Sequence, residues 1–304
     1  MGLKMKRGTI QVDLDGLWTI LGYYGMKHPV ENDPIYETAI PRFIELFRKY
    51  DLKATFFVIG RDLEVPKKRK LIQQLAKEGH EIANHTYNHH FGFRKLPREK
   101  KEAEISKTEL LIQKATGTKP AGFKAPGYDL DEQGLQILQQ RGYAYDSSVL
   151  PSFYYQPLQI ANSILNRTKI RTHGPRIRWG FAPNKPYRIS NSLWRKTNRK
   201  DALLEVPCTV MPWLRLPFQT AFIFLAGMRY FKAGYLLTKR KNIPLNYTFH
   251  AIDLADDIKD KNIPSTQRIP LRKRMKICEQ ILQNICKDYK IMTTTELISQ
   301  PKKK

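Results

Sequence analysis

The amino-acid sequence predicts an α/β protein built mainly from parallel strands. Short apolar runs typical of buried strands alternate with longer segments whose apolar residues recur at helical spacing. Of the 304 residues, 41% are hydrophobic, which is typical of a chain with a packed core. The length is enough for one large α/β domain or for two small ones.

The predicted strands are short and apolar, and several of them end at polar or acidic residues. Residues 9–14 form an apolar run that ends in acidic side chains. Residues 54–59 are rich in Phe and β-branched residues, and Gly60 ends the run. The predicted strands are residues 9–14, 54–59, 80–84, 121–124, 143–146, 203–206, 245–250 and 290–292.

Five segments between these strands carry helical signals. Residues 97–117, for example, begin with Pro and end with Gly, as helices commonly do. An apolar window at residues 216–231 is interrupted by Pro217 and Arg229 and is shorter than the ~20 residues that a membrane span needs. We expect it to form a buried helix, and a position on a membrane surface is the alternative. The predicted helices are residues 34–50, 67–78, 97–117, 131–141 and 268–288.

The alternation of strands and helices is lost over residues 151–201. This stretch is rich in Pro, Asn, Arg and Tyr, and it is predicted to be a long, irregular insertion. Because long ordered loops in compact domains usually serve a function, we expect the insertion to do so.

The chain is strongly basic, with 53 Lys and Arg residues, 28 Asp and Glu residues and a net charge of +25. Such a field favours anionic partners, among them nucleic acid, anionic lipid and phosphorylated substrates. Charge alone does not indicate specific recognition, so we expect no specific nucleic-acid partner. The first residues contain no apolar run of the signal-peptide type. We therefore expect a cytoplasmic protein, and peripheral contact with the anionic inner face of the membrane remains open.

Two carboxylates, Asp13 and Asp15, follow the first predicted strand. At positions i and i+2 of a strand, their side chains would share one face. The carboxyl ends of parallel strands are where the active sites of α/β barrels and open α/β sheets gather. The alternative is a simple turn, because Asp and Gly are favoured in turns in any case.

Four of the seven histidines lie between residues 80 and 90. His85 and His89 are four positions apart, and on a helical turn their imidazoles would point the same way. Imidazoles in this arrangement are typical ligands of zinc or a similar ion. Together with the carboxylates elsewhere, the cluster favours a metal site. The alternative is a polar turn whose histidines only cap and pack.

Three further polar residues lie at the ends of predicted strands. Lys124 stands beside a Pro-Gly turn, and Asp146 ends the fifth strand. His250 closes the run at residues 245–250, where a histidine is well placed to act as an acid or a base. Each has a structural alternative in isolation, such as a core histidine with satisfied hydrogen bonds for His250.

Taken together and in this order, these segments resemble the polysaccharide deacetylase family, the NodB-type carbohydrate esterases. The strongest similarity lies in ATFFVIG at residues 54–60 and GHEIANHTYNH at residues 79–89. GFKAPGY at residues 122–128 and GYAYDSS at residues 142–148 are similar to deacetylases of exopolysaccharide and glycolipid synthesis. The Asp-x-Asp form of the first motif resembles the branch that holds peptidoglycan-deacetylase-like enzymes and the lipid-linked aminoarabinose deformylase.

The resemblance implies a fold and a set of residue roles. The fold is a distorted (β/α) barrel of about seven strands, forming a single catalytic domain over residues 1–304 with an insertion at about residues 151–201. The implied roles are metal ligands for Asp15, His85 and His89, catalytic base for Asp13, catalytic acid for His250, and the acidic residue of the fourth motif for Asp146. Lys124 stands where the family usually has an Arg that orients the base. Lysine is a point charge without the bidentate fork of arginine, so the base could be held differently.

The implied function is metal-dependent hydrolytic deacylation of an amino sugar, with N-deacetylation as the simplest case. The implied cofactor is one divalent ion, Zn²⁺ by default, with Co²⁺, Ni²⁺ and Fe²⁺ as alternatives. The substrate would be part of a glycan, a glycolipid or a sugar-linked intermediate. The basic charge favours a lipid- or phosphate-linked sugar, because cations suit phosphate. Aromatic side chains of the insertion would either bind sugar rings or pack the insertion onto the barrel: Phe153, Tyr154, Tyr155, Trp179, Tyr187 and Trp194.

Two other classes of function remain open. One is a metal-dependent amidohydrolase that acts on a non-sugar C–N bond. The other is a non-catalytic basic protein that binds a membrane or nucleic acid, for which nucleic-acid binding would depend steeply on salt. The presence of Asp13, the histidine pair and His250 favours the sugar deacylase.

Overall fold

The computed structural model describes residues 5–300, apart from residues 24, 159, 161–173, 175, 190 and 259–268. The strands form one sheet in the order β6-β7-β5-β4-β3-β2-β1-β8, and β9 pairs with β1. All neighbouring strands are parallel except β6 and β7, which are antiparallel. The strands are β1 (Lys6–Asp13), β2 (Thr55–Val58), β3 (Glu81–Asn84), β4 (Gly122–Phe123), β5 (Tyr145–Asp146), β6 (Tyr187–Ile189), β7 (Leu203–Glu205), β8 (Leu245–His250) and β9 (Tyr289–Ile291).

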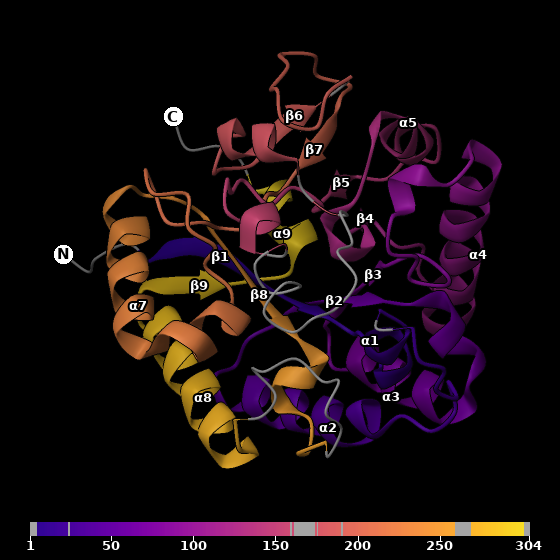
Figure 1. Ribbon diagram of the computed structural model, residues 1–304, viewed down its shortest axis with the longest axis horizontal. Helices are drawn as coiled ribbons and strands as arrows, with labels where there is room; N and C mark the ends of the chain where they lie inside the picture. The colour runs from indigo at the N-terminus through magenta and orange to yellow at the C-terminus, as the bar shows by residue number, and fades with distance from the viewer. Residues whose placement is uncertain are drawn as a thin grey trace.

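Helices surround the sheet, which lies in the middle of the molecule (Figure 1). All five predicted helices are present within a few residues of their expected bounds. The helix expected in the apolar window is present as α7, and two short helices that were not predicted, α1 and α9, join them. The helices are α1 (Leu17–Tyr23), α2 (Pro34–Lys49), α3 (Pro66–Lys77), α4 (Arg98–Thr116), α5 (Glu132–Gln140), α7 (Thr220–Arg240), α8 (Leu271–Asp288) and α9 (Thr294–Ser299).

The apolar window at residues 216–231 contributes to α7, which continues well past it. Ile223 and Phe231 are buried, whereas Leu225 is 66% exposed, so the expected buried helix is buried along one side only. The helix is interrupted at Gly227, whose φ of 81° lies in the left-handed region. Within the described ranges, no helix combines the length and the hydropathy of a membrane span.

The sheet is curled into an incomplete barrel. Its two edges approach each other where the chain after β7 runs beside β8: the backbone N–H of Thr209 donates to the carbonyl oxygen of Asn246 at 3.0 Å. The backbone N–H of Asn246 donates in return to Thr209 Oγ1 at 2.8 Å. The distorted barrel is therefore confirmed, but the described part of the chain forms nine strands where about seven were expected.

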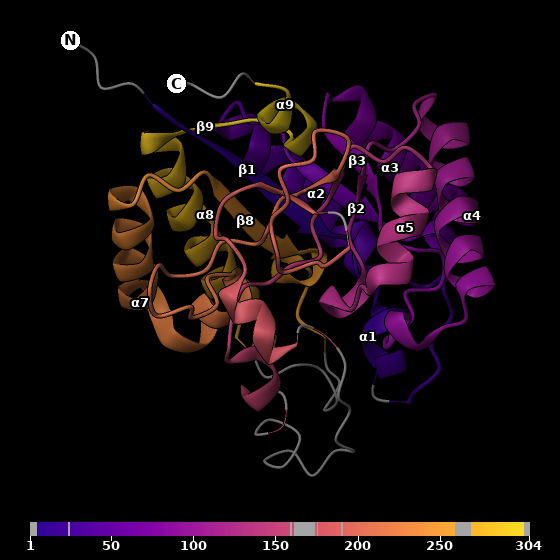
Figure 2. The ribbon, with the colours of Figure 1, turned by 90° about the horizontal axis from the view of Figure 1, so that it is seen from above.

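The interior of this barrel is polar at its amino end. Ile10 and Val12 of β1 belong to the main hydrophobic core, and the alternate residues Thr9 and Gln11 turn to the other face. Thr294 of α9 hydrogen-bonds with Thr9 (Oγ1 to Oγ1, 3.1 Å) and with Gln11 (Nε2 to Oγ1, 3.2 Å). Helix α9 thus covers the end of the barrel opposite to α1 (Figure 2). The carboxyl ends of the strands remain for the site.

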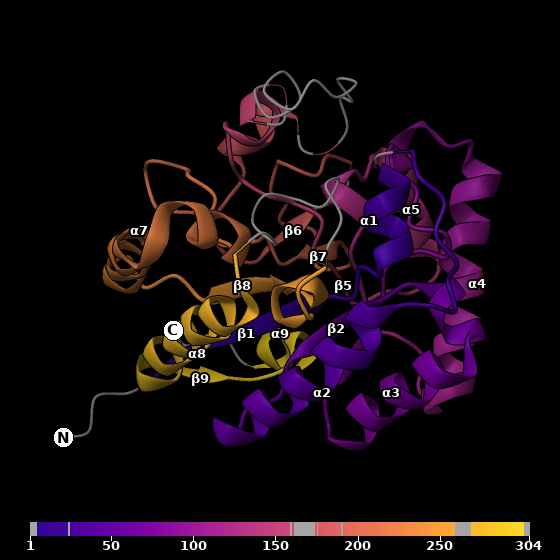
Figure 3. The same ribbon diagram turned by 60° about the horizontal axis from the view of Figure 1, so that its bottom comes forward.

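Part of the insertion at residues 151–201 packs onto the barrel. Strand β6 extends the sheet beside β7, and the side chains of Trp179 and Tyr187 are 2% and 6% exposed. For these two aromatics, packing is therefore the role that the structure supports, whereas Tyr154 is 40% exposed. Figure 3 shows β6, β7 and α7 above β8 and β1, and residues 161–173 fall outside the described part.

Candidate metal centre and active site

The predicted site residues lie at the carboxyl ends of neighbouring parallel strands. Asp13 is the last residue of β1 and is the register partner of His250, the last residue of β8. The ladder continues past β3 and β4, because the backbone N–H of His85 donates to Val58 and that of Lys124 to Asn84. Main-chain hydrogen bonds therefore fix the backbone position of each of these residues.

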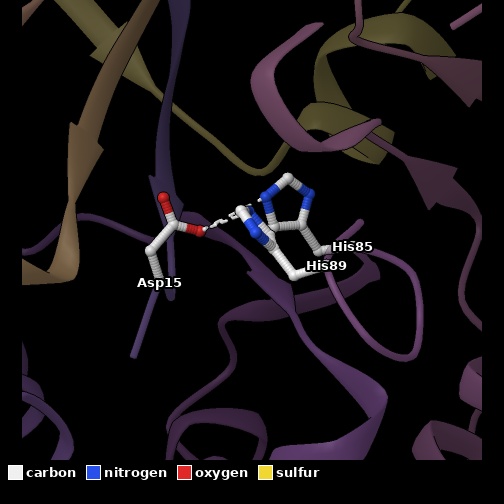
Figure 4. Close-up of side chains that lie close together, drawn as sticks. All are labelled: Asp15, His85 and His89. Atoms are coloured by element: carbon white, nitrogen blue, oxygen red, sulfur yellow. Dashed lines mark ion pairs between the residues drawn. The ribbon is translucent and has the colours of Figure 1, made fainter. Parts of the chain in front are cut away.

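Asp15, His85 and His89 converge on one point. Asp15 Oδ1 lies 3.4 Å from His85 Nε2 and 3.1 Å from His89 Nε2. One ligand atom from each residue lies within 4.8 Å of the other two. Figure 4 shows the carboxylate directed at the two imidazole rings. A carboxylate and two imidazoles are a common three-residue set for a catalytic zinc ion, which keeps a further position open.

The donor atoms of this cluster fit a metal ion. His85 Nδ1 lies 2.7 Å from the backbone carbonyl oxygen of Lys124, so it carries the proton and leaves the lone pair of Nε2 for a metal. Asp15 Oδ1 and both ring nitrogens of His89 are buried without a hydrogen-bond partner. Buried polar atoms without partners are rare, and an ion at this point would satisfy them. Burial raises the pKa of Asp15, but the two histidines outweigh it and hold that pKa well below its usual range.

The loop that carries the histidines is not the helical turn that their spacing indicated. Residues 85–90 have no helical assignment, and Thr86 and His89 have φ values of 66° and 52°. Strained residues of this kind persist where the surroundings hold them. Glu104 of α4 does so here, because its Oε2 accepts from the backbone N–H groups of Tyr87 (3.0 Å) and Asn88 (2.7 Å). The imidazoles of His85 and His89 converge as predicted, but a loop held by the buried Glu104 brings them together and not a helical turn.

The other two histidines of the cluster serve the scaffold. His80 is 6% exposed and packs edge-on against Phe47 and Phe56, and its Nδ1 accepts from the backbone N–H of Ala54. Burial lowers the pKa of His80 to about 4, so it stays neutral. His90 lies against Glu104 at 3.3 Å, with 46% of its side chain exposed.

Asp13 lies between a buried cation and the predicted acid. Lys124 Nζ donates to Asp13 Oδ1 at 2.7 Å, and the two side chains are 1% and 5% exposed. Asp13 Oδ2 lies 3.8 Å from His250 Nε2. Lys124 therefore binds one carboxylate oxygen of Asp13, and the other oxygen faces His250. The ammonium also lies 4.4 Å from the ring centroid of Phe57, which helps to stabilise its charge.

His250 is held by the segment that follows it. The backbone N–H of His250 donates to Asp253 Oδ2 at 3.0 Å across η5 (Ala251–Leu254). Arg274 of α8, which is fully buried, donates to the carbonyl oxygens of Ile252 at 2.8 Å and Asp253 at 2.9 Å. These contacts fix the backbone on which His250 stands.

Asp146 is the register partner of Phe123, the residue before Lys124, and its catalytic role stays a prediction. Its side chain accepts from Ser148 Oγ at 2.6 Å, and Glu205, its register partner on β7, lies against it. Ser148 Oγ in turn accepts from the backbone N–H of Ala125 at 2.8 Å. Asp146 therefore contacts the backbone beside Lys124 through a serine. Neither its position at a strand end nor its place in the GYAYDSS motif distinguishes a catalytic role from this structural one.

Sequence reasoning missed the supporting residues Glu104, Asp253 and Arg274. Glu104 and Arg274 belong to predicted helices whose charged residues would ordinarily face solvent. Asp253 follows His250 by three positions in the sequence, and this spacing is the one local signal that could have identified a support.

Comparisons with known proteins point to the family that the sequence motifs resemble. Residues 31–145 match the family model of polysaccharide deacetylases. A peptidoglycan deacetylase of Helicobacter pylori is 29% identical over 143 residues, which are 46% of this chain and 48% of that protein. A peptidoglycan-N-acetylglucosamine deacetylase of Bacillus cereus is 34% identical over 130 residues, which are 43% of this chain and 56% of that protein. The chain thus spans about half the length of the curated relatives it matches.

Solved structures share the fold at low sequence identity. A Mycobacterium smegmatis protein assigned to the polysaccharide deacetylases has a TM-score of 0.60 at 15% identity, over 98% of this chain and 91% of that one. A Bacillus anthracis protein described as a CE4 family pseudoenzyme has a TM-score of 0.51 at 13% identity, over 97% and 66% of the two chains. The comparisons confirm the resemblance that the motifs predict: residues 31–145 are similar to the polysaccharide deacetylases, and the fold is shared over nearly the whole chain.

Proposed function

We propose that this protein is a metal-dependent hydrolase that removes an N-acyl group, in the simplest case acetyl, from an amino sugar. The observation that carries the proposal is the convergence of Asp15, His85 and His89 beside the Asp13–Lys124 ion pair and His250. Two curated relatives are named peptidoglycan deacetylases, which supports an amino-sugar substrate.

The metal would be held by Asp15, His85 and His89. When bound, a divalent ion in such a site supplies Lewis-acid activation of the acyl carbonyl and of water. Zn²⁺ suits two imidazoles and a carboxylate, and Co²⁺, Ni²⁺ and Fe²⁺ suit the same donors.

The remaining residues handle protons. Asp13 Oδ2 is the oxygen that Lys124 leaves free, and it takes a proton from the water that attacks the acyl carbon. The C–N bond then breaks, and the amine nitrogen needs a proton because an amide anion is a poor leaving group. His250 Nε2, which lies 3.8 Å from Asp13 Oδ2, donates that proton. Lys124 holds Asp13 Oδ1 throughout, so the carboxylate keeps its orientation.

The deacylation itself is tested by the release of acetate and the appearance of a free amine. Metal-loaded protein should produce both from N-acetylated sugars, and removal of the metal with a chelator should stop the reaction reversibly. The assay is necessary because the fold alone does not imply catalysis: a neighbour with this fold is described as a pseudoenzyme. Failure of the loaded protein on soluble, lipid-linked and polymeric N-acetyl sugars alike would refute the proposed function.

We further propose that the substrate is a lipid-linked or nucleotide-linked amino sugar of cell-envelope glycan assembly, met in the cytoplasm at the inner membrane face. The net charge of +25 supports it, because a phosphate-bearing substrate and an anionic membrane would both be attracted. The test compares rates on lipid-linked or soluble N-acetyl sugars with rates on chitin or peptidoglycan. A clear preference for the polymers would refute this substrate class and leave the deacylation intact.

A further inference from the structure

Three charged side chains lie buried directly behind the loop that carries Asp15. Lys68 Nζ of α3 lies 2.7 Å from Asp33 Oδ2 and 2.6 Å from Asp62 Oδ1. The lysine side chain is 3% exposed, and neither carboxylate has any exposed surface. Buried ions are costly unless each is paired and hydrogen-bonded, so a cluster of three needs a reason in the structure.

The two carboxylates bind the chain just after Asp15. Asp33 Oδ1 accepts from the backbone N–H of Leu17 at 3.1 Å, in addition to capping α2. Asp62 Oδ1 accepts from the indole Nε1 of Trp18 at 2.9 Å. The first two residues of α1 are therefore tied to the buried cluster.

The same cluster reaches the residues on either side of Asp15. The Tyr36 hydroxyl donates to Asp62 Oδ2 at 2.9 Å and lies 3.3 Å from the carbonyl oxygen of Leu14. A Cβ atom at Gly16 would lie 2.2 Å from Asp33 Oδ2, so only glycine allows this approach. Leu14, Gly16 and the start of α1 thus all lie against the cluster, which holds the backbone on both sides of Asp15.

Lys68 is the member that allows the cluster to exist. It contacts both carboxylates, and its ammonium also lies 4.4 Å from the ring centroid of Tyr36. Without it, two carboxylates would remain buried without their cation and would have to move apart or take up protons. Either change would shift the hydrogen bonds that hold the residues around Asp15.

We propose that the Lys68–Asp33–Asp62 cluster fixes Asp15 for metal binding, with Lys68 as a positioning residue that acts through the two aspartates. The inference rests on the metal site of the proposed function. His85 is oriented separately, by the carbonyl of Lys124, so the cluster supports the carboxylate arm of the site. Supports of metal ligands typically contribute about 10- to 100-fold in metal affinity.

The test compares Lys68→Met with Lys101→Met. Lys101 is a second buried lysine, 1% exposed and 2.6 Å from Asp131 Oδ2, and it joins α4 to the start of α5 away from the Asp15 loop. Affinity for Co²⁺ and Zn²⁺ is measured on the full chain by competition with a chelator, and thermal unfolding of the metal-free proteins is recorded alongside. We expect metal affinity about 10- to 100-fold weaker in Lys68→Met and unchanged in Lys101→Met.

A second variant guards against loss of folding. Trp18→Phe removes the indole N–H that Asp62 accepts while keeping an aromatic ring in place, and we expect a smaller loss of metal affinity in the same direction. Unchanged affinity in a folded Lys68→Met, or in Trp18→Phe if Lys68→Met does not fold, would overturn the inference alone. A wild-type protein that binds no metal would overturn both the inference and the proposed function.

Discussion

The exposed fractions of the site side chains match the roles proposed for them. A quarter of the His250 side chain is exposed (25%), whereas Asp13 and Lys124 are 5% and 1% exposed. A proton donor to a leaving amine must reach the substrate. A base held by a buried ion pair can lie deeper, because it has to reach the attacking water and not the leaving group.

His250→Asn tests the acid role. Asparagine has no group that can donate a proton as imidazolium does, so kcat should fall by about 10²- to 10⁴-fold. Metal content should not change, because His250 is outside the ligand group. Acetate release and metal analysis on the same preparation check both points. A variant with nearly full kcat would remove His250 from the mechanism.

At the residue scale, motif order in the sequence predicted which side chains meet, but not what holds them. Asp13, Asp15, His85, Lys124 and His250 follow strand ends, and parallel strands bring such ends to one edge. The supports come from far along the chain and from helices that look solvent-exposed in sequence. Pairings of that kind depend on tertiary packing, which one sequence does not reveal.

At the scale of elements, the paired strands β5 and β7 place two acidic residues side by side. Asp146 and Glu205 are register partners without exposed surface, and the backbone N–H of Val149 donates to Glu205 Oε1 at 3.0 Å. Burial raises the pKa of Asp146 to about 6, and burial together with Asp146 raises the pKa of Glu205 well above its usual range. The folded pair therefore retains protons that the unfolded chain releases near pH 4.

The pair should destabilise the protein as pH rises. Between the unfolded pKa, about 4, and the raised folded values, the native state binds more protons, so the free energy of unfolding falls with rising pH. Glu205→Gln keeps the oxygen that accepts from Val149 and removes one acid. The difference in free energy of unfolding between this variant and the wild type should shift in favour of the variant by on the order of 2 kcal/mol from pH 4 to pH 7.

Denaturant unfolding of both proteins across that range measures the difference. Other buried groups also titrate, such as His80, whose lowered pKa acts in the opposite direction, and the comparison cancels them. Glu279→Gln, at a glutamate whose side chain is 42% exposed, serves as the control and should follow the wild-type curve. A Glu205→Gln curve parallel to the wild type would mean that the folded pair does not retain protons as described.

Element prediction succeeded where the sequence marks the start or the end of a helix clearly. Helices such as α2 and α4 begin with Pro or directly after it and carry a clear start or stop signal, and they lie where the sequence placed them. The short helices α1 and α9 were missed because six or seven residues carry too little pattern, and β6 was missed because it lies in the stretch where the alternation of strands and helices is lost. Helix α1 depends on the buried Asp33–Lys68 contact, a tertiary cause.

At the scale of the whole molecule, exposed apolar residues lie together with basic ones. Trp213 and Leu214 are 65% and 52% exposed on a tight turn, and Phe181 is 69% exposed. Arg215 links the two segments by donating to the carbonyl oxygen of Ala182 at 2.9 Å. Tryptophan beside cations is typical of surfaces that meet a membrane interface.

We predict that the protein binds vesicles containing anionic lipid and that Trp213→Ser/Leu214→Ser weakens this binding several-fold. The substitutions remove apolar area that would enter the interface, and higher salt should weaken the remaining electrostatic part. Cosedimentation with anionic and neutral vesicles at two salt concentrations provides the measurement. Equal binding of wild type and variant would exclude this turn as the contact.

The metal content of the purified protein tests the central claim most directly. Wild-type protein and His85→Ala/His89→Ala, both reconstituted with Zn²⁺ or Co²⁺ and freed of excess ion, are analysed by mass spectrometry, with circular dichroism to verify folding. Convergence of Asp15, His85 and His89 predicts about one ion per wild-type chain and none in the folded variant. A wild-type chain that retains no ion, or a variant that retains as much as the wild type, would contradict the metal centre and the hydrolytic function built on it.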